Sequence, residues 1–490
     1  MTHIPVLIII IPLCAALLCP LVTKANKMAG HMLVTVALAL AFVMSVIQLV
    51  QVIQTGTIHY HMGGYDMPLG IEFVIDTVNA IILVMASLIG FLTLLFSDRF
   101  TYSNENTQGV ANAVLTLLCV GLYGMTSTGD VFNLYVFLEI TSLSAYCLIA
   151  LGGDKGVVSA YRYMLVGTIA ATFYLVGVGI LYANTGTLNM ADMAERLNGG
   201  QYDSAMLLAM FFLIAAFGIK MALFPFHGWQ PSAYTYAQAG VRPLITGVMG
   251  KIPAYAMFRY LFCVYGTDFR YLKPILLMVG IMSVFSMLYG SIRAIAQTDI
   301  RKILAYSSVA QIGYISLGFA IGTPVALAGA FIHMLGHAFM KGGLFFCTGA
   351  IRYKYGTVNI NDFGRIYKKM PLTTGLLVIA ALSMIGIPPT AGFFSKWYLA
   401  VGAAGQQQWI YLAVLVISSL LNAIYFFRLI EKVFLQEKKE NVRPKIEPVK
   451  ELPAKMLIPI VVCFLAILGI GLFNVKIFEI LMISLKGVGL

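Results

Sequence analysis

Long apolar runs, each close to the length of a membrane-crossing helix, follow one another along the whole sequence. A helix needs about 20 apolar residues to cross roughly 30 Å of hydrocarbon, and about fourteen such runs are present. We predict membrane spans at 4–23, 28–54, 71–97, 108–127, 129–151, 158–183, 204–226, 241–265, 274–294, 301–321, 324–350, 371–401, 409–433 and 456–485. The pattern therefore predicts an all-α membrane protein.

Two of the predicted spans are interrupted by proline close to a lysine. The segment AAFGIKMALFPFHGWQP places Lys220 five residues before Pro225, and ALSMIGIPPTAGFFSKW places Pro388 and Pro389 ahead of Lys396. Interrupted helices at matching places in two halves of a transporter indicate inverted repeats and an ion site. We therefore predict two inverted five-helix repeats, spans 4–8 and spans 9–13, each containing one broken helix.

The chain is expected to form one polytopic membrane domain over residues 1–490. Its parts are three N-terminal spans (1–107), a first repeat (108–265), a second repeat (274–433), a charged inner loop (435–455) and a last span (456–485). Loops after odd-numbered spans carry most of the lysine and arginine, which predicts that both termini lie on the outer side. A second span follows the first directly, without a small-residue cleavage site, so we interpret the first as a retained helix.

Composition supports the membrane assignment and excludes several functions. Hydrophobic residues make up 60% and charged residues 11% of the chain, whereas a soluble domain is about 25% charged. The net charge of +12 is mostly a topology signal, because no basic stripe for nucleic acid is present. The seven cysteines lie in predicted spans without CxxC spacing, and no phosphate-binding loop occurs. We expect no metal and no cofactor in this chain.

Charged residues inside apolar spans are the strongest functional signal. Glu139, Lys220, Lys251 and Lys396 all lie within predicted spans, where a charge costs about 3 kcal/mol on insertion scales. Glu139 is the acidic residue in the middle of a span, and Lys220 is its expected cation partner. The alternative for Lys220 is snorkelling to the inner interface. The alternative for Lys396 is a structural cation that neutralises carbonyl groups freed by the two prolines.

A further row of titratable residues lies on one predicted helix. His333, His337 and Lys341 are spaced i, i+4, i+8 and so share one face. Histidine exchanges protons near neutral pH, so this face predicts a proton relay. The HxxxH spacing lacks the glutamate of HExxH, which argues against zinc.

Five segments together resemble a known family. They are GDVFNLYVFLEI, IKMALFPFHGW, QTDIRKILAYSSVAQIGYISLG, HMLGHAFMKGGLFF and IGIPPTAGFFSKWYL. The chain resembles the antiporter-like subunits shared by respiratory complex I, Mrp-type cation/proton antiporters and membrane-bound hydrogenases. Its length is similar to that of the D-type Mrp subunit or its hydrogenase counterpart. The resemblance implies one proton relay through Glu139, Lys220, Lys251, His333, His337, Lys341 and Lys396.

The resemblance also implies the setting in which the chain works. The expected partners are other membrane subunits of an Mrp-like or hydrogenase-like complex, protons, Na⁺ and membrane lipid, in a prokaryotic cell (inner) membrane. The expected function is that of a proton-translocating subunit of a multisubunit sodium/proton antiporter. The first alternative is a proton- or sodium-pumping subunit of a membrane-bound hydrogenase or complex I-like oxidoreductase, and the second is a non-conducting scaffold, against which the buried charges argue. The chain departs from the family pattern at Gln230, Arg242 and Pro253. Pro253 is expected to alter the path near Lys251.

Overall fold

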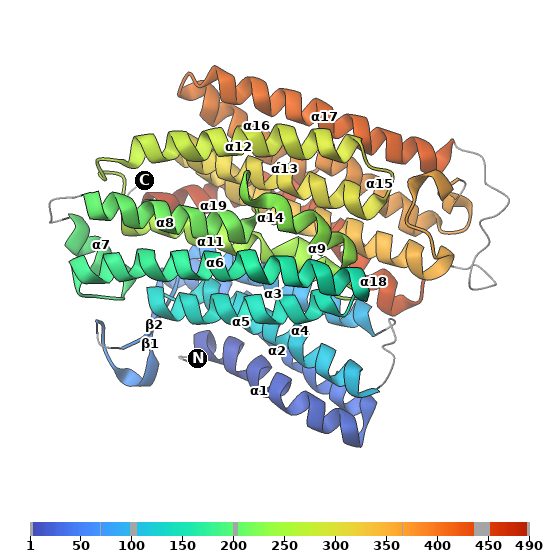
Figure 1. The fold of residues 1–490 in the computed structure, drawn as a ribbon, viewed down its shortest axis with the longest axis horizontal. Helices are drawn as coiled ribbons and strands as arrows, with labels where there is room; N and C mark the ends of the chain where they lie inside the picture. Colours follow the sequence, from blue (N-terminus) through green and yellow to red (C-terminus); the bar gives the residue numbers. More distant parts are fainter. Residues whose placement is uncertain are drawn as a thin grey trace.

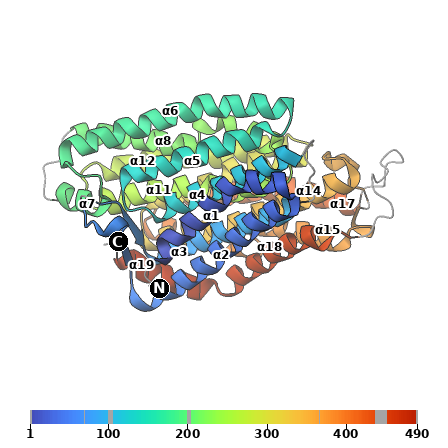
Figure 2. The ribbon, with the colours of Figure 1, turned by 90° about the horizontal axis from the view of Figure 1, so that it is seen from below.

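The helices lie side by side in one elongated bundle, and the two ends of the chain lie at the same end of it (Figures 1 and 2). The computed structural model describes residues 3–68, 70–98, 105–198, 204–364, 366–435 and 451–487. Within these residues, twelve helices are long and apolar enough to cross a membrane. The predicted all-α membrane fold is confirmed.

The N-terminal part consists of three long helices and a small hairpin. The helices are α1 (Ile4–Ala25), α2 (Lys27–Thr55) and α3 (Thr77–Ser97), and the hairpin pairs β1 (Ile58–His61) with β2 (Glu72–Ile75). The prediction of a span starting at residue 71 was wrong at its first residues, which form β2. Asp76 ends the strand by accepting the backbone N–H of Asn79 at 2.9 Å, which caps α3.

The first five-helix unit contains a long, interrupted helix. Its elements begin with α4 (Glu105–Ser127), α5 (Val131–Ala150), α6 (Asp154–Thr185), the short α7 (Met190–Asn198), α8 (Ser204–Met221) and α9 (Gln230–Tyr236). The predicted span 204–226 was too short, because the chain leaves the helix at Ala222 (φ 61°) and resumes as α9. Lys220 therefore lies near the middle of the broken span, away from the interface.

The predicted span 241–265 is a chain of short helical pieces. It comprises α10 (Arg242–Leu244), a π-helical turn (Ile245–Met249), α11 (Lys251–Phe258) and a second π-helical turn (Arg259–Val264). A π-helical turn shifts the backbone hydrogen bonds and is often found at functional sites. One such turn lies directly before Lys251.

The second five-helix unit surrounds the most buried helix of the protein. The unit comprises α12 (Leu272–Ile295), α13 (Ile300–Ile321), α14 (Pro324–Tyr355), α15 (Pro371–Ile385), α16 (Ala391–Gly405) and α17 (Trp409–Phe434). The membrane-spanning part of α14 is completely buried, and α14 packs against α13, α15, α16 and α18. Its titratable side chains are therefore enclosed by protein.

The end of the chain forms two helices where the sequence predicted one span. These are α18 (Ala454–Leu472) and α19 (Asn474–Gly487), which meet at Phe473. The end of α18 packs tightly on the break in span 12, since a Cβ at Gly471 would lie 2.0 Å from the Pro389 carbonyl oxygen. Most of the predicted charged loop, residues 436–450, lies outside the described residues.

Among the described residues, each five-helix unit contains one isolated β-bridge, and the two bridges lie at matching places in the two units. Asp130 bridges to Asn189 in the first unit, and Asp299 bridges to Asn359 in the second. Each aspartate caps the second helix of its unit, and each asparagine follows the left-handed glycine that ends the third helix. The bridge in the first unit directly precedes α7, and the bridge in the second unit joins the residue before α13 to the segment that follows α14. This correspondence supports the proposed inverted repeats.

Candidate functional site

Glu139 and Lys220 lie opposite each other on α5 and α8. Lys220 Nζ lies 3.7 Å from Glu139 Oε1, and Lys220 is 3% exposed whereas Glu139 is 29% exposed. The ammonium group donates a hydrogen bond of 2.7 Å to Ser142 Oγ, one turn along α5 from Glu139. The structure thus brings together the two predicted partners and adds a neutral acceptor between their helices.

Lys251 lies deeper in the bundle and is held by its own helix. Its Nζ donates to the Thr246 carbonyl oxygen at 2.6 Å, within the π-helical turn that precedes it. A small void with room for about one water molecule lies beside Lys220 and is lined by Ser142, Met249 and Pro253, among others. Met249 and Pro253 lie two residues before and after Lys251 in the chain. The void therefore borders both Lys220 and the segment that carries Lys251.

The three titratable residues of α14 face α13 and α16. His333 Nε2 is hydrogen bonded to Gln311 Oε1 and His333 Nδ1 to Ser395 Oγ, both at 2.9 Å. The rings of His333 and His337 are stacked with centroids 5.9 Å apart. Neither nitrogen of the buried His337 has a hydrogen-bond partner among the described residues.

Lys341 completes this face of α14. Its Nζ donates to the Leu304 carbonyl oxygen at 2.6 Å and also bonds Ser307 Oγ, both on α13. The π-helical turn before Lys251 packs on α14 between His337 and Lys341, since a Cβ at Gly247 would lie 3.2 Å from the Ala338 carbonyl oxygen. The segment that carries Lys251 therefore meets the titratable face of α14 near the middle of that helix.

Lys396 lies at the far end of the row, beside the break in span 12. Its Nζ donates to the carbonyl oxygens of Met384 at 3.1 Å and Ile385 at 2.9 Å, at the end of α15. It also lies 4.9 Å from the ring centroid of Tyr314, which packs against His333. The carbonyl contacts are those that the structural alternative for Lys396 requires, and Tyr314 links Lys396 to the α14 face that carries His333.

Several neutral partners in the site were not identified from the sequence. Five neutral side chains each contact a titratable side chain of the row: Ser142, Ser307, Gln311, Tyr314 and Ser395. Their signal was weak, because single serines and glutamines in apolar spans often bond only their own helix. The sequence offered one indication of such partners: a polar residue one helical turn from a buried charged residue, as Ser142 is from Glu139.

Arg242, a departure from the family pattern, is a buried cation outside this row. Its Nη2 donates to the carbonyl oxygens of Thr235 at 3.2 Å and Ala237 at 2.5 Å, and its guanidinium lies 6.0 Å from the Phe345 ring. Arg242 therefore caps the end of α9 and fixes it against α14, one turn beyond Lys341. The described residues contain no cluster of histidine, cysteine, aspartate and glutamate that could hold a metal ion.

Comparison with known proteins gives a family match over the central part of the chain. The family described as NADH:quinone oxidoreductase/Mrp antiporter, TM, matches residues 128–422. This range contains all seven residues of the predicted relay.

Similar proteins cover almost the full chain. The NADH-quinone oxidoreductase subunit N of Desulforudis audaxviator (strain MP104C) is 45% identical over 485 residues, which are 97% of each chain. The D-type subunit of the Na(+)/H(+) antiporter of Bacillus subtilis (strain 168) is 29% identical over 453 residues, 92% of this chain and 91% of that one. A chain of the membrane-bound sulfane sulfur reductase, an archaeal respiratory membrane complex, superposes with a TM-score of 0.91 at 26% identity, covering 99% of this chain and 98% of the other.

Proposed function

The chain belongs to the NADH:quinone oxidoreductase/Mrp antiporter family of membrane subunits, and from this premise we propose that it moves protons through its buried row of lysines and histidines. The observation that carries the proposal is the set of buried titratable groups that runs from the Glu139–Lys220 pair through Lys251 and α14 to Lys396. Groups of this kind inside a membrane are costly, and they are retained where they conduct or couple charge.

The Glu139–Lys220 pair is the element that controls proton occupancy. At about 4 Å and an effective dielectric near 20, such a pair interacts by on the order of 4 kcal/mol. A change of that size alters the proton occupancy of the lysine about a thousandfold. When the carboxylate is neutralised or its charge is met by another cation, Lys220 releases its proton toward Lys251. Ser142 then holds the neutral amine in place.

The remaining groups pass the proton along α14. The segment of Lys251 packs on α14 beside His337 and Lys341, and all three side chains are buried. Positive charges on these groups therefore disfavour one another. A proton arriving at one of them therefore favours release from the next, toward His333 and Lys396. Gln311 and Ser395 fix the His333 ring in one orientation on this route.

The chain is an antiporter-like membrane subunit of the Mrp, complex I or related type, and we propose a redox-driven complex as its host. The higher identity to an oxidoreductase subunit (45%) than to an antiporter subunit (29%) supports this choice. In that setting the redox centres lie in other subunits. A sodium/proton antiporter is the second candidate, supported by similarity to the Bacillus subtilis antiporter protein over 92% of the chain.

Purification of the native complex tests the proposed host complex, and its reconstitution tests the proposed proton path. Iron–sulfur or nickel–iron subunits that copurify with the chain support the redox-driven host, whereas small hydrophobic Mrp-type subunits support the antiporter. Proton transport is then measured in proteoliposomes driven by the matching reaction or sodium gradient. Absence of proton movement in a fully assembled, driven complex contradicts the relay, and the scaffold hypothesis remains.

A further inference from the structure

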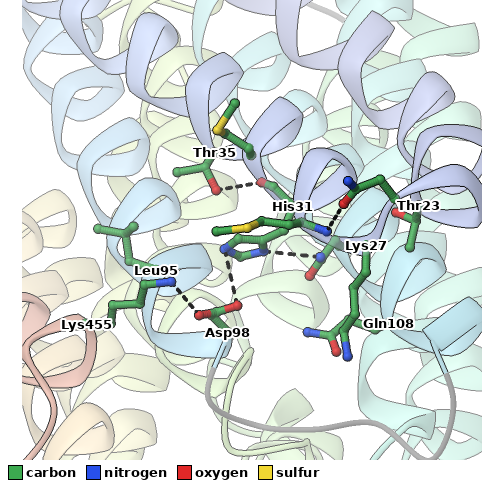
Figure 3. A pocket seen from close by; sticks show the side chains of 12 residues that line it. Thr23, Lys27, His31, Thr35, Leu95, Asp98, Gln108 and Lys455 are labelled. Carbon is green, nitrogen blue, oxygen red and sulfur yellow. Dashed lines mark hydrogen bonds and ion pairs between the residues drawn. The ribbon is translucent and has the colours of Figure 1, made fainter.

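The cations of the bundle are compensated in two different ways. Some face a carboxylate: Lys220 Nζ lies 3.7 Å from Glu139 Oε1, and Lys455 Nζ lies 2.8 Å from Asp98 Oδ2 in a cavity of about 640 Å³ among the N-terminal helices (Figure 3). Lys396 is 6% exposed, and its described partners are two carbonyl oxygens at the end of α15 and an aromatic ring. Neutral groups therefore determine how firmly Lys396 holds its proton.

The partners of Lys396 differ in how well they distinguish its two protonation states. An ammonium group has three N–H donors, and the carbonyl oxygens of Met384 and Ile385 accept two of them. A neutral amine keeps two N–H donors and can satisfy the same two oxygens. The ring of Tyr314, with its centroid 4.9 Å from Nζ, attracts a cation through its negative face. It offers no such attraction to a neutral amine, so the ring favours the protonated form.

The hydroxyl group of Tyr314 is anchored on α17. It accepts a hydrogen bond from Asn422 Nδ2 at 3.4 Å and lies 3.3 Å from Ser419 Oγ. Tyr425 donates its hydroxyl proton to Asn422 Oδ1 at 2.5 Å, which orients the amide so that its NH₂ group points to Tyr314. Because its hydroxyl group is held on α17, Tyr314 presents its ring to Lys396 on α16.

The same ring contacts the next titratable group of the row. The centroids of the Tyr314 and His333 rings are 5.3 Å apart, their planes are inclined by 32°, and both side chains are completely buried. Positive charges on His333 and Lys396 disfavour one another in such a site. Tyr314 therefore lies against both groups between which the proposed path passes its proton, and it gives Lys396 a favourable partner there.

Few other ionisable groups surround Lys396 among the described residues. α16 packs on α13, α14, α15, α17 and α18, and α15 carries no ionisable side chain. Tyr314 faces Lys396 from α13 and His333 lies on α14, where His337 and Lys341 follow one and two turns further along. The remaining ionisable side chains of α16, α17 and α18 lie near helix ends or contact other groups: Tyr398, Tyr411, Tyr425, the charged residues in the last two turns of α17, Lys455 and Cys463.

We propose that Tyr314 is a positioning residue for Lys396, whose ring holds the ammonium group at the end of α15 and sets the pH at which this end of the row exchanges its proton. The inference rests on the proposed proton path and adds to it a residue of α13 that itself carries no proton. The alternative role of Tyr314 is to fill space between α13, α14 and α16. The two roles differ in their dependence on pH.

The unfolding temperature of the purified complex, measured from about pH 5 to about pH 10, tests the ring without requiring transport. Tyr314→Leu is expected to unfold at a lower temperature than the wild type at low pH, and the difference is expected to shrink as the pH rises. The sign follows because a group whose protonated form is favoured by folding adds stability at low pH and loses it as it deprotonates. Tyr314→Phe keeps the ring, so its difference from the wild type should not change with pH. In a Lys396→Met background, Tyr314→Leu should show no pH-dependent difference.

The pH profile of driven proton transport in proteoliposomes tests the consequence for function. In Tyr314→Leu the alkaline limb is expected to move by about 1.5 units toward acid, which is about a thirtyfold weaker hold on the proton, since a desolvated cation–π contact is worth about that factor. The control Tyr265→Leu removes another buried tyrosine, whose hydroxyl group donates to the Met206 carbonyl oxygen outside the row. It should leave both pH dependences unchanged.

The outcomes separate this inference from the proposed function. A stability difference in Tyr314→Leu that does not vary with pH, or an equal pH-dependent effect in Tyr314→Phe or Tyr265→Leu, overturns the role of the ring. An unshifted transport profile in Tyr314→Leu overturns its part in proton exchange. A wild-type complex that moves no protons, while Tyr314→Leu keeps its pH-dependent stability difference, contradicts the proposed function and supports the effect of the ring on Lys396.

Discussion

Lys220 Nζ lies 3.7 Å from the Glu139 carboxylate, but its hydrogen bond of 2.7 Å goes to the hydroxyl group of Ser142. The ion pair is therefore close but not locked by a direct hydrogen bond. A loosely held pair is suited to switching, because the ammonium group keeps a neutral partner when the carboxylate is neutralised. A tightly bonded pair would have to break a charge-assisted hydrogen bond, which is roughly twice as strong as a neutral one.

Removal of either member of the pair tests this switch. Glu139→Ala and Lys220→Ala are each expected to lower driven proton transport by about 100-fold, because a positioned proton-transfer group contributes at least that much. Both variants are expected to insert and assemble. Glu431→Ala, which removes an exposed acid at the end of α17, is the control with normal transport. Normal transport in vesicles from either pair variant would show that the pair is not part of the path.

Lys396 separates a proton-carrying role from a structural one. Arginine can donate to the Met384 and Ile385 carbonyl groups as lysine does, but it does not release its proton at accessible pH. Lys396→Arg is therefore expected to retain the unfolding temperature of the complex and to lose transport. Lys396→Ala is expected to lower the unfolding temperature and also to lose transport. Transport close to wild type in Lys396→Arg would leave Lys396 only its structural role at the end of α15.

Arg242 is expected to matter for stability through the end of α9. Arg242→Met leaves the Thr235 and Ala237 carbonyl groups buried without their donor, at a cost of about 1–3 kcal/mol for a group left unpaired. The unfolding temperature should fall, and Arg242→Lys should recover part of the loss. The exposed Arg270 provides the control Arg270→Met. An unchanged unfolding temperature in Arg242→Met would contradict the capping role.

The two bridges of the five-helix units should differ in their contribution to stability. Asn189 accepts the backbone N–H groups of Ala191 and Asp192 and also donates to the buried carboxylate of Glu72 at 2.9 Å. Asn359 accepts the N–H of Asn361 at 3.1 Å. Asn189→Ala is therefore expected to destabilise by about 1–3 kcal/mol more than Asn359→Ala, because it leaves a buried charge with one partner fewer. Equal unfolding temperatures would show that the Glu72 contact adds nothing.

The chain should depend on its partner subunits for activity. Produced alone and reconstituted in liposomes, it is expected to show little or no cation/proton exchange, while the assembled complex moves protons. The physical reason is that Glu139 is partly exposed on the side of α5, so its charge depends on what covers that surface. Robust exchange by the single purified chain would instead indicate an independent carrier.

The sequence by itself determined the membrane class, the positions of most helices and the set of buried charges. It could do so because the bilayer constrains the chain strongly. The backbone of a span must be helical, a span needs about 20 apolar residues, and a charge within a span is costly and therefore rare. The proline positions likewise indicated both broken spans. These signals are local and depend on one segment at a time.

Tertiary structure alone decided what each buried group touches. Lys220 bonds a serine 78 residues away, Lys341 bonds α13, and Lys396 points to the end of α15. The continuation of the broken span through α9, the π-helical turns around Lys251 and the break at Phe473 were also decided at this level. Each depends on how helices distant in sequence pack, because a freed carbonyl or a buried ammonium group takes the partner that packing brings within reach.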